Sequence, residues 1–476
     1  MFLTLLAIHN PSRSPTSFFI RGCDYLKYQL TKELLDNYYS TLYNQFKTGK
    51  DRITPQKFNA IKDAEFDLIL KKINDYSYTF TNFKSINLPT NREVYIPTIR
   101  DRLVIEFLKD KLKQKYRVSF PNRDDIIKSI LLKFDSKMDY YVIRLDIKSF
   151  FNSIRQNKLL YKIKNKSLLS SQEYYLLKEF LKRFKKGLPQ GLPASNALSE
   201  IYMESFDQEL KQIHPRMNYY CRYVDDILII MNGSFSNKEV NIIKEKITSI
   251  FKSHTLEINE NELKYKFTQF PLKDNTSSTF DFTYLGYKFL CHQKKVTTTI
   301  SQQKIDKFKE KIIYCFEEFK TNHNLELLIQ RLDFLTQKNA VIKKETFITP
   351  KNKIEHRKKK ICFGFIENYK YISKNKKADI AKEIDELLIM QFNNIKYILN
   401  SNLYGINTEL KNRLYSISLS CNMNKFNAIY RYKKEDYVKK LLAINLYYNR
   451  NILESLTYSE LSRLYFKQLK YSYLIT

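Results

Sequence analysis

Two adjacent aspartates, Asp225 and Asp226, interrupt an apolar stretch of the sequence, "CRYVDDILII" (residues 221–230). β-forming residues lead into the pair and a second β-forming run follows it, which predicts a hairpin over residues 219–230 with two like charges at its tip. Like charges at contact distance repel each other. The tip is therefore either an ordinary acidic turn that faces water or a place where something strongly positive binds.

A third aspartate ends another apolar run upstream. In "YYVIRLDIKSFFNSI" (residues 140–154) a short predicted strand ends at Asp146. A carboxylate at the end of a buried strand is costly unless it is solvated, paired or bound to metal. If this strand lies beside the hairpin, Asp146, Asp225 and Asp226 converge. Such oxygen ligands suit two Mg²⁺ ions, which can activate a 3′-hydroxyl and stabilise leaving pyrophosphate.

The composition favours a polyanionic partner. The 476 residues suggest roughly three domains. They include 82 Lys and Arg against 50 Asp and Glu, a net charge of +32, together with 36 Tyr and 33 Phe. Basic side chains bind phosphates with release of counterions, and aromatic rings stack on bases. An AT-rich coding bias toward Lys, Asn, Ile and Tyr is the alternative explanation for the excess of lysine.

The cysteines and the N-terminus bear on the compartment. The six cysteines are scattered, with no CxxC pair and no zinc-like spacing, which is typical of reduced thiols in a cytoplasmic protein. The apolar stretch "FLTLLAI" (residues 2–8) is too short to span a bilayer, so no membrane association is expected.

Glycine and proline are scarce, and four of them fall in "GLPQGLP" (residues 187–193). Gly187 and Gly191 allow the backbone to approach a ligand closely, and this loop would present Gln190 ahead of an amphipathic helix. An ordinary loop before a helix is the alternative. Helices are also predicted over 24–48 and 98–114, and a capping box of Ser236 and Glu239 opens another. No proline follows Pro350, which predicts a mainly helical C-terminal region.

The order of four fragments resembles the palm of a reverse transcriptase. These are "LDIKSFF", "LPQGLPASNALS", "RYVDD" and "YLGYKF", all between residues 145 and 289. The segment "NREVYIPTIRDRLVIEFLKDKL" (residues 91–112) resembles the fingers of bacterial group II intron, retron and abortive-infection enzymes. The resemblance covers roughly residues 80–320 and implies an α+β right-hand polymerase that extends DNA from dNTPs on an RNA template with two Mg²⁺ ions.

The resemblance also implies roles for individual residues. The aspartates Asp146, Asp225 and Asp226 would be the catalytic metal ligands. Phe151 would exclude a ribose 2′-hydroxyl, although core packing is the usual role of such a ring. The remaining assignments are Gln190 at the nascent base pair, Tyr223, Leu285 and Gly286 at the primer, and Arg92, Arg100 and Arg102 at the triphosphate or template.

One segment departs from the family pattern. Related enzymes often place a lysine three residues after "LN", where it can protonate pyrophosphate. Here "LEINENELKYKF" places Glu262 at that spacing, and the lysine comes later, as Lys264. Lys264 is therefore the candidate general acid.

The downstream sequence narrows the kind of reverse transcriptase. The segments 327–341 and 362–372 resemble the helical region that follows the palm in defence-associated and abortive-infection enzymes, and no HNH or RNase H motif is evident. The expected role is antiphage defence with a structured noncoding RNA. A retron or group II intron-type enzyme, and a catalytically silent RNA-binding scaffold, remain alternatives. Whether the protein forms a homo-oligomer is left open.

The sequence divides into four expected regions. These are an N-terminal helical segment (1–80), fingers and palm (81–300), thumb-like helices (301–345) and a helical C-terminal domain (346–476). The run "KNKIEHRKKK" (residues 351–360) follows Pro350 and reads as a mobile basic loop, either a solvated face or an RNA contact through Lys358, Lys359 and Lys360.

Overall fold

The computed structural model describes most of the chain. The described residues are 30–43, 46, 48–87, 93–134, 138–270, 280–292, 295–348, 354–401, 407–445 and 447–470. The apolar stretch 2–8 and Arg92 lie outside them.

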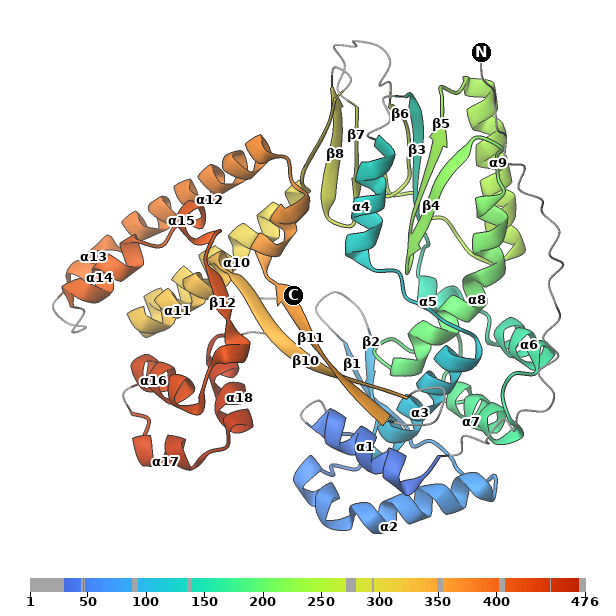
Figure 1. Ribbon diagram of the computed structural model, residues 1–476, viewed down its shortest axis with the longest axis horizontal. Helices are drawn as coiled ribbons and strands as arrows, with labels where there is room; N and C mark the ends of the chain where they lie inside the picture. The colour runs from blue at the N-terminus through green and yellow to red at the C-terminus, as the bar shows by residue number, and fades with distance from the viewer. Residues whose placement is uncertain are drawn as a thin grey trace, which may run out of the picture.

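A four-stranded antiparallel sheet in the order β4-β5-β3-β6 forms the palm (Figure 1). It confirms both the predicted hairpin, as β4 and β5, and the predicted strand that ends at Asp146, as β3. The strands are β3 (Tyr140–Asp146), β4 (Met217–Tyr223), β5 (Asp226–Asn232) and β6 (Lys266–Phe270).

The palm sheet lies between two hydrophobic cores, and every residue of β3 is buried. Tyr141, Ile143 and Leu145 belong to one core, which also contains residues of α8 and α9. Tyr140 and Val142 face the other core, with residues of α4 and of a second sheet. Because both faces are covered, the central strands β3 and β5 are mostly apolar rather than alternating.

Two helices of the palm match the sequence predictions. Ser236 and Glu239 form the expected capping box of α9, and α8 follows the "GLPQGLP" loop with Pro193 in its first turn. The palm helices are α4 (Arg123–Lys133), α5 (Phe150–Ser153), α6 (Gln156–Lys166), α7 (Ser171–Leu181), α8 (Pro193–Lys211) and α9 (Asn237–Ser253).

A second antiparallel sheet, β7-β8-β9, connects the palm to the helices that follow. The turn between β7 and β8 contains Leu285 and Gly286, both with positive φ. Ser301 is the N-cap residue of α10, and the assignment of a thumb that begins there stays a prediction. The strands are β7 (Phe280–Tyr284), β8 (Tyr287–His292) and β9 (Lys295–Ile300).

The N-terminal part is helical apart from a small hairpin, and α3 packs against α8. The helix predicted over 98–114 is confirmed as α3. The elements of this N-terminal part are α1 (Lys32–Leu42), α2 (Pro55–Asn74), β1 (Lys84–Asn87), β2 (Glu93–Ile96) and α3 (Ile99–Lys115).

The C-terminal part is mainly helical, but the prediction of a loop over residues 351–360 was wrong for 354–360, and 351–353 lie outside the described residues. Residues 354–363 form β11, which pairs with β10 in a long antiparallel ribbon, and β12 pairs with β10 in parallel. In Figure 1 the ribbon extends away from β12 in the direction of α1 and α3. The elements are α10 (Gln302–Asn322), α11 (Leu325–Thr336), β10 (Lys338–Ile348), β11 (Ile354–Phe363), η3 (Phe365–Tyr371), α12 (Lys374–Asn394), α13 (Lys396–Asn400), α14 (Thr408–Tyr415), α15 (Leu419–Asn422), β12 (Phe426–Ala428), η5 (Ile429–Arg431), α16 (Lys434–Ile444), α17 (Arg450–Ser455) and α18 (Tyr458–Gln468).

Two further observations concern the described residues alone. None of their helices combines the length and the apolar character needed to cross a membrane. The five cysteines within them are free thiols: Cys221, Cys291, Cys315, Cys362 and Cys421.

Candidate active site

The three aspartates meet at one end of the palm sheet. Asp146, the last residue of β3, is the cross-strand partner of Asp226, the first residue of β5. The backbone N–H of Ile147 donates to the carbonyl of Asp225 at 3.0 Å, which ties the end of β3 to the hairpin tip. The convergence expected from the sequence is therefore present in the backbone.

The backbone of the hairpin tip is strained, and the Arg222 side chain supports it through a hydrogen bond. Val224 has φ +60°, a conformation that is costly for a β-branched residue. The Arg222 guanidinium donates to the Val224 carbonyl at 2.9 Å. On its other side it donates to the carboxylates of Asp207 at 2.8 Å and of Glu200 at 2.7 Å, both on α8. Arg222 therefore couples the turn that carries Asp225 to a helix of the core.

Asp226 forms a two-pronged ion pair with Arg144. The guanidinium of Arg144 donates to both carboxylate oxygens at 3.1 Å, and it also donates to the Leu263 carbonyl and the Thr283 hydroxyl. Burial raises the pKa of Asp226, and the neighbouring charges of Asp146 and Asp225 raise it further, while Arg144 opposes them. The three carboxylates are thus close enough to repel one another.

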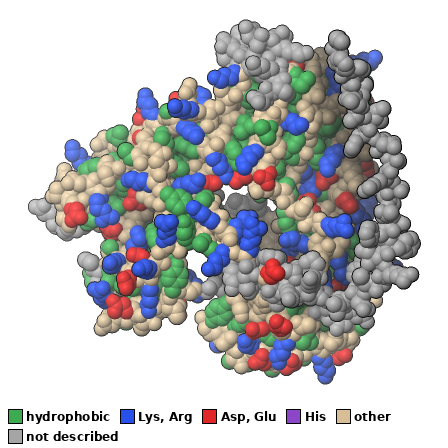
Figure 2. Space-filling model, in the orientation of Figure 1, with side chains coloured by type: hydrophobic (Ala, Val, Ile, Leu, Met, Phe, Trp, Pro, Cys, Tyr) green, Lys and Arg blue, Asp and Glu red, His purple; other side chains and the backbone are tan. Residues whose placement is uncertain are grey.

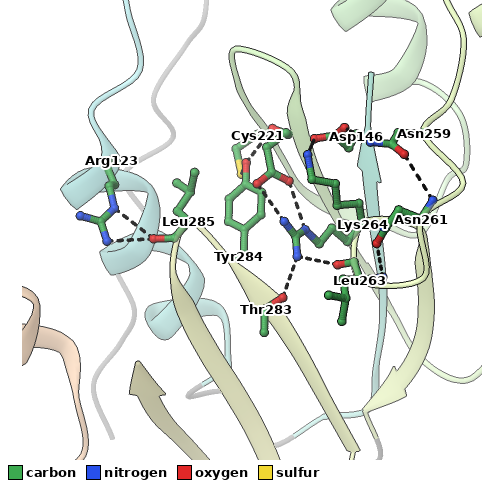
Figure 3. Close-up of polar contacts among 12 residues, drawn as sticks. Arg123, Asp146, Cys221, Asn259, Asn261, Leu263, Lys264, Thr283, Tyr284 and Leu285 are labelled. Carbon is green, nitrogen blue, oxygen red and sulfur yellow. Dashed lines mark hydrogen bonds and ion pairs between the residues drawn. The ribbon is translucent and has the colours of Figure 1, made fainter. Parts of the chain in front are cut away.

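Asp146 is 3% exposed and accepts two side-chain hydrogen bonds (Figure 3). Asn259 donates to Oδ1 and Lys264 donates to Oδ2, each at 2.7 Å. The structure thus brings the candidate general acid to the first aspartate. Arg144 and Lys264 supply the positive charge that the cluster needs in this state.

The carboxylates match a divalent cation in chemical type, since hard cations prefer oxygen ligands. Across the residues that the structure describes, however, no group of three or more His, Cys, Asp or Glu side chains is arranged to hold a metal ion. In this arrangement Oδ2 of Asp146 accepts from Lys264, and both oxygens of Asp226 accept from Arg144. An ion bound through Oδ2 of Asp146 would replace the hydrogen bond from Lys264.

Phe151 and the "GLPQGLP" loop lie together. Leu188 donates its N–H to the Phe151 carbonyl at 2.8 Å. A Cβ at Gly187 would lie 2.5 Å from the same carbonyl oxygen, so this close approach requires glycine. Phe150 is 4% exposed and packs in the core, whereas Phe151 is only partly buried at the edge of that core.

The loop also contacts the N-terminal hairpin. The carbonyl of Gln190 accepts from the N–H of Tyr95 in β2 at 3.2 Å. A Cβ at Gly191 would lie 2.5 Å from a methyl of Val94, in the same strand. Gln190 thus lies where the palm meets β2, and its contact with a base pair stays a prediction.

The predicted primer site lies at the turn between β7 and β8. Arg123 donates twice to the Leu285 carbonyl, at 2.8 and 3.1 Å (Figure 3). Arg123 and Lys304 also share one neutral acceptor, Oδ1 of Asn368. Burial, followed by repulsion from Arg123 and Lys311, lowers the pKa of Lys304 to about 7. Tyr223 lies at the end of β4 and is partly buried against the hydrophobic core that contains Tyr140 and Val142.

Arg100 and Arg102 take part in ion pairs at the start of α3. Arg100 lies 3.7 Å from Glu65, and Arg102 lies 2.8 Å from Glu106. Within the described residues no contact joins either arginine to the aspartates. Their assignment to the triphosphate or template stays a prediction.

Lys358, Lys359 and Lys360 are exposed residues of β11 rather than of a loop. Lys359 lies directly opposite Lys343 of β10, and a like-charged cross-strand pair destabilises a ribbon. Lys360 lies 4.3 Å from the ring centroid of Phe426. Figure 2 shows Lys and Arg side chains gathered beside a hollow at the centre of this face.

Sequence reasoning missed the cations that support the site, Arg144, Arg222 and Arg123. Two of them left a signal. In "YYVIRLD" and "YYCRYVDD" a single arginine interrupts an apolar strand two or three residues before an aspartate. A buried arginine needs a carboxylate partner, so the pattern points to a charge network around the aspartates. Arg123 comes from a distant helix and left no such signal.

This arrangement defines the palm of a right-hand polymerase, with paired strands that place carboxylates at one end of the sheet. Residues 86–289 match the family described as "Reverse transcriptase (RNA-dependent DNA polymerase)". The matched part, less than half of the chain, is thus similar to the reverse transcriptase domain of that family, whose enzyme class is RNA-directed DNA polymerase. Enzymes of this family use divalent metal ions.

The matches among solved structures are telomerases, at low sequence identity and low TM-score. Apo telomerase from Candida tropicalis truncated from its C-terminal domain is 16% identical, with 53% of this chain and 62% of that chain covered and a TM-score of 0.34. Apo telomerase from the same organism is 13% identical, with 77% and 61% covered and a TM-score of 0.37. Telomerase from Candida albicans in complex with a fragment of telomeric RNA is 11% identical, with 85% and 69% covered and a TM-score of 0.34. The chain thus spans less than two thirds of the length of the first two telomerase chains. The curated proteins yielded no match.

Proposed function

We propose that this protein extends a DNA strand from dNTPs on an RNA template, in antiphage defence, with a structured noncoding RNA as its partner. The convergence of Asp146, Asp225 and Asp226 at one end of the palm, beside Arg144 and Lys264, carries the polymerase part of the proposal. The defence role and the noncoding RNA rest on the resemblance of residues 327–341 and 362–372 to the defence-associated enzymes.

Each residue has a defined part in the proposed reaction. Asp146 and Asp225, with Asp226 beside them, would hold two Mg²⁺ ions. When bound, these ions supply Lewis-acid activation of the primer hydroxyl and stabilise the leaving pyrophosphate. Lys264, once displaced from Asp146, would donate a proton to pyrophosphate. Arg144 keeps the Asp226 carboxylate in place during these changes.

The direct test is incorporation of radiolabelled dNTPs by the purified protein. We expect incorporation with Mg²⁺ that is lost on chelation, and we expect RNase treatment of the co-purifying RNA to abolish it. Protein that retains its RNA but incorporates no dNTP under any of these conditions would favour the RNA-binding scaffold.

Replacing Phe151 by Ala should raise the use of rNTPs relative to dNTPs by about tenfold or more, because relief of a clash worth ~1.4 kcal/mol corresponds to a factor of ten. The ratio of rNTP to dNTP incorporation measures the effect. Phe150→Leu is the matched control, since Phe150 packs in the core and its change should leave the ratio unaltered. An unchanged ratio in Phe151→Ala would assign this ring to packing alone.

Replacing Lys358, Lys359 and Lys360 by Gln should weaken RNA binding and flatten its salt dependence. The log–log slope should fall by about 0.7–0.9 for each RNA phosphate that the protein no longer neutralises. The slope is measured by titrating the RNA at several salt concentrations. A control triple variant removes the same charge from three exposed lysines of α9: Lys238, Lys246 and Lys252. Equal slopes for the two triple variants would mean that the ribbon is a solvated surface.

A further inference from the structure

The C-terminal part encloses a cavity that the proposed polymerase reaction does not use. Its volume is about 300 Å³, at the lower end of the range for small-ligand sites. It lies among α11, α14, η5, α16 and α18. Its lining includes aromatic rings, a lysine and carboxylates: Phe334, Tyr432, Tyr465, Phe466, Lys440, Glu326 and Asp333.

Lys440 is a cation of this cavity that has no anionic partner. Its ammonium lies 5.2 Å from the ring centroid of Tyr432 and 5.8 Å from that of Tyr465. Within the described residues it forms no ion pair and donates no side-chain hydrogen bond. Burial lowers the pKa of Lys440, against the attraction of Asp333 and Glu326.

Asp333 presents an incompletely satisfied carboxylate to the same cavity. Its Oδ1 accepts from Gln337 at 3.1 Å and from Asn422 at 3.4 Å, whereas no described residue donates to Oδ2. Burial raises the pKa of Asp333, and Lys440 is among the charges that oppose this rise. Asp333 and Lys440 attract each other but do not come within 4.0 Å, so each remains available to a third group.

The other charged pair of the cavity is neutralised internally. Arg413 donates to Glu326 at 2.8 and 3.3 Å, and Gln330 donates to the same carboxylate at 2.9 Å. Among the described residues, Oδ2 of Asp333 and the ammonium of Lys440 therefore lack such a partner. A simple ion would satisfy one end and be repelled by the other.

We propose that this cavity binds a guanine base. Guanine presents acceptors, O6 and N7, along one edge, which a lysine can donate to. Its N1–H and N2–H₂ lie on another edge and can both donate to a carboxylate such as Asp333. The flat rings of Tyr432, Tyr465 and Phe466 provide surfaces for a planar base. Of the four RNA bases, only guanine joins two adjacent donors to a pair of acceptors.

The base has two sources, a free guanine nucleotide or an unstacked guanosine of a bound RNA, and the experiment separates them. Isothermal titration of the full-length protein with GMP, IMP and AMP tests the free nucleotide. IMP lacks the N2 amine, so it should bind at least about tenfold more weakly than GMP. Fluorescence anisotropy with a single-stranded uridine decamer that carries one central guanosine, inosine or adenosine tests the RNA.

Asp333→Asn and Lys440→Met should each reduce guanine binding at least about tenfold in the arm where it occurs, because each loses one recognised edge. Lys467→Met, a change of an exposed lysine on α18, is the control and should bind like the unmodified protein. Thermal melting checks that the variants fold. If neither the nucleotides nor the decamers discriminate guanine from adenine, or if Asp333→Asn folds and binds guanine unchanged, the proposal is wrong.

Discussion

Asp225→Asn and Asp146→Asn should each reduce dNTP incorporation at least about a thousandfold. Lewis-acid stabilisation by a bound ion is worth several kcal/mol of barrier, and each ~1.4 kcal/mol is a factor of ten. Asn retains the shape of Asp but lacks the negative charge that a divalent cation requires. Steady-state incorporation of labelled dNTP measures the loss.

The same variants should remain folded, because each of them removes a negative charge from a cluster of like charges. Asp225 and Asp146 both raise the pKa of Asp226, so removing either charge relieves repulsion. Asp146→Asn leaves Lys264 without its carboxylate, but the Lys264 side chain is 42% exposed and can turn to water.

Asp226→Asn provides the internal comparison. This change leaves Arg144, whose side chain is only 11% exposed, without its two-pronged partner. The expected cost is roughly 1–3 kcal/mol of unfolding free energy, the penalty for a buried group that loses its partner. Near-normal incorporation by Asp225→Asn or Asp146→Asn would contradict the metal assignment, and equal stability of all three variants would contradict the role of Arg144.

The palm was largely predictable because its signals are local. A strand buried on both faces leaves a continuous apolar run, and a carboxylate that ends such a run is costly enough to stand out. Ser236 and Glu239, three residues apart, encode the start of α9 within a single turn. The pairing of Asp146 with Asp226 was conditional on two strands lying side by side, which the register of β3 and β5 confirms.

The β10–β11 ribbon was missed for a physical reason. Strand prediction relies on one apolar and one polar face, but β11 exposes Arg357, Lys358, Lys359 and Lys360 in succession, so lysines occupy both faces. This strand is fixed by pairing with β10. In most of the pairs, the two partners lie more than ten residues apart in the sequence. No period-two pattern marks it, and the run therefore resembled a loop.

Of the three supporting cations, Arg123 could not be found from the sequence, because its partners come from distant elements. Arg123 on α4 contacts Leu285 and Asn368, which lie 162 and 245 residues further along the chain. Charge alone could not distinguish such an arginine from the many lysines on the surface. Arg222 is different, since its position in an apolar strand shows that it is buried, and this makes it the most informative supporting residue to change.

Arg222→Met should destabilise the protein by about 3–5 kcal/mol, the usual cost of removing one partner from a buried ion network. The guanidinium is 6% exposed and is the common partner of Glu200 and Asp207. Without it, two partly buried carboxylates lack this cation, and the Val224 carbonyl loses a donor. Chemical denaturation monitored by circular dichroism measures the change.

Two further variants distinguish a network effect from a simple loss of charge. Arg216 directly precedes β4 of the same hairpin and forms an ion pair with Glu239. Because the Arg216 side chain is 37% exposed, Arg216→Met should lower the free energy of unfolding by at most about 1 kcal/mol. Adding Glu200→Gln and Asp207→Asn to Arg222→Met removes the orphaned charges and should restore part of the lost stability. We expect low dNTP incorporation both in Arg222→Met and in this triple variant. In both, the strained turn that carries Asp225 lacks the hydrogen bond from Arg222. Full recovery of both stability and incorporation would show that Arg222 only balances charge, whereas recovery of stability alone would show that it positions the catalytic turn.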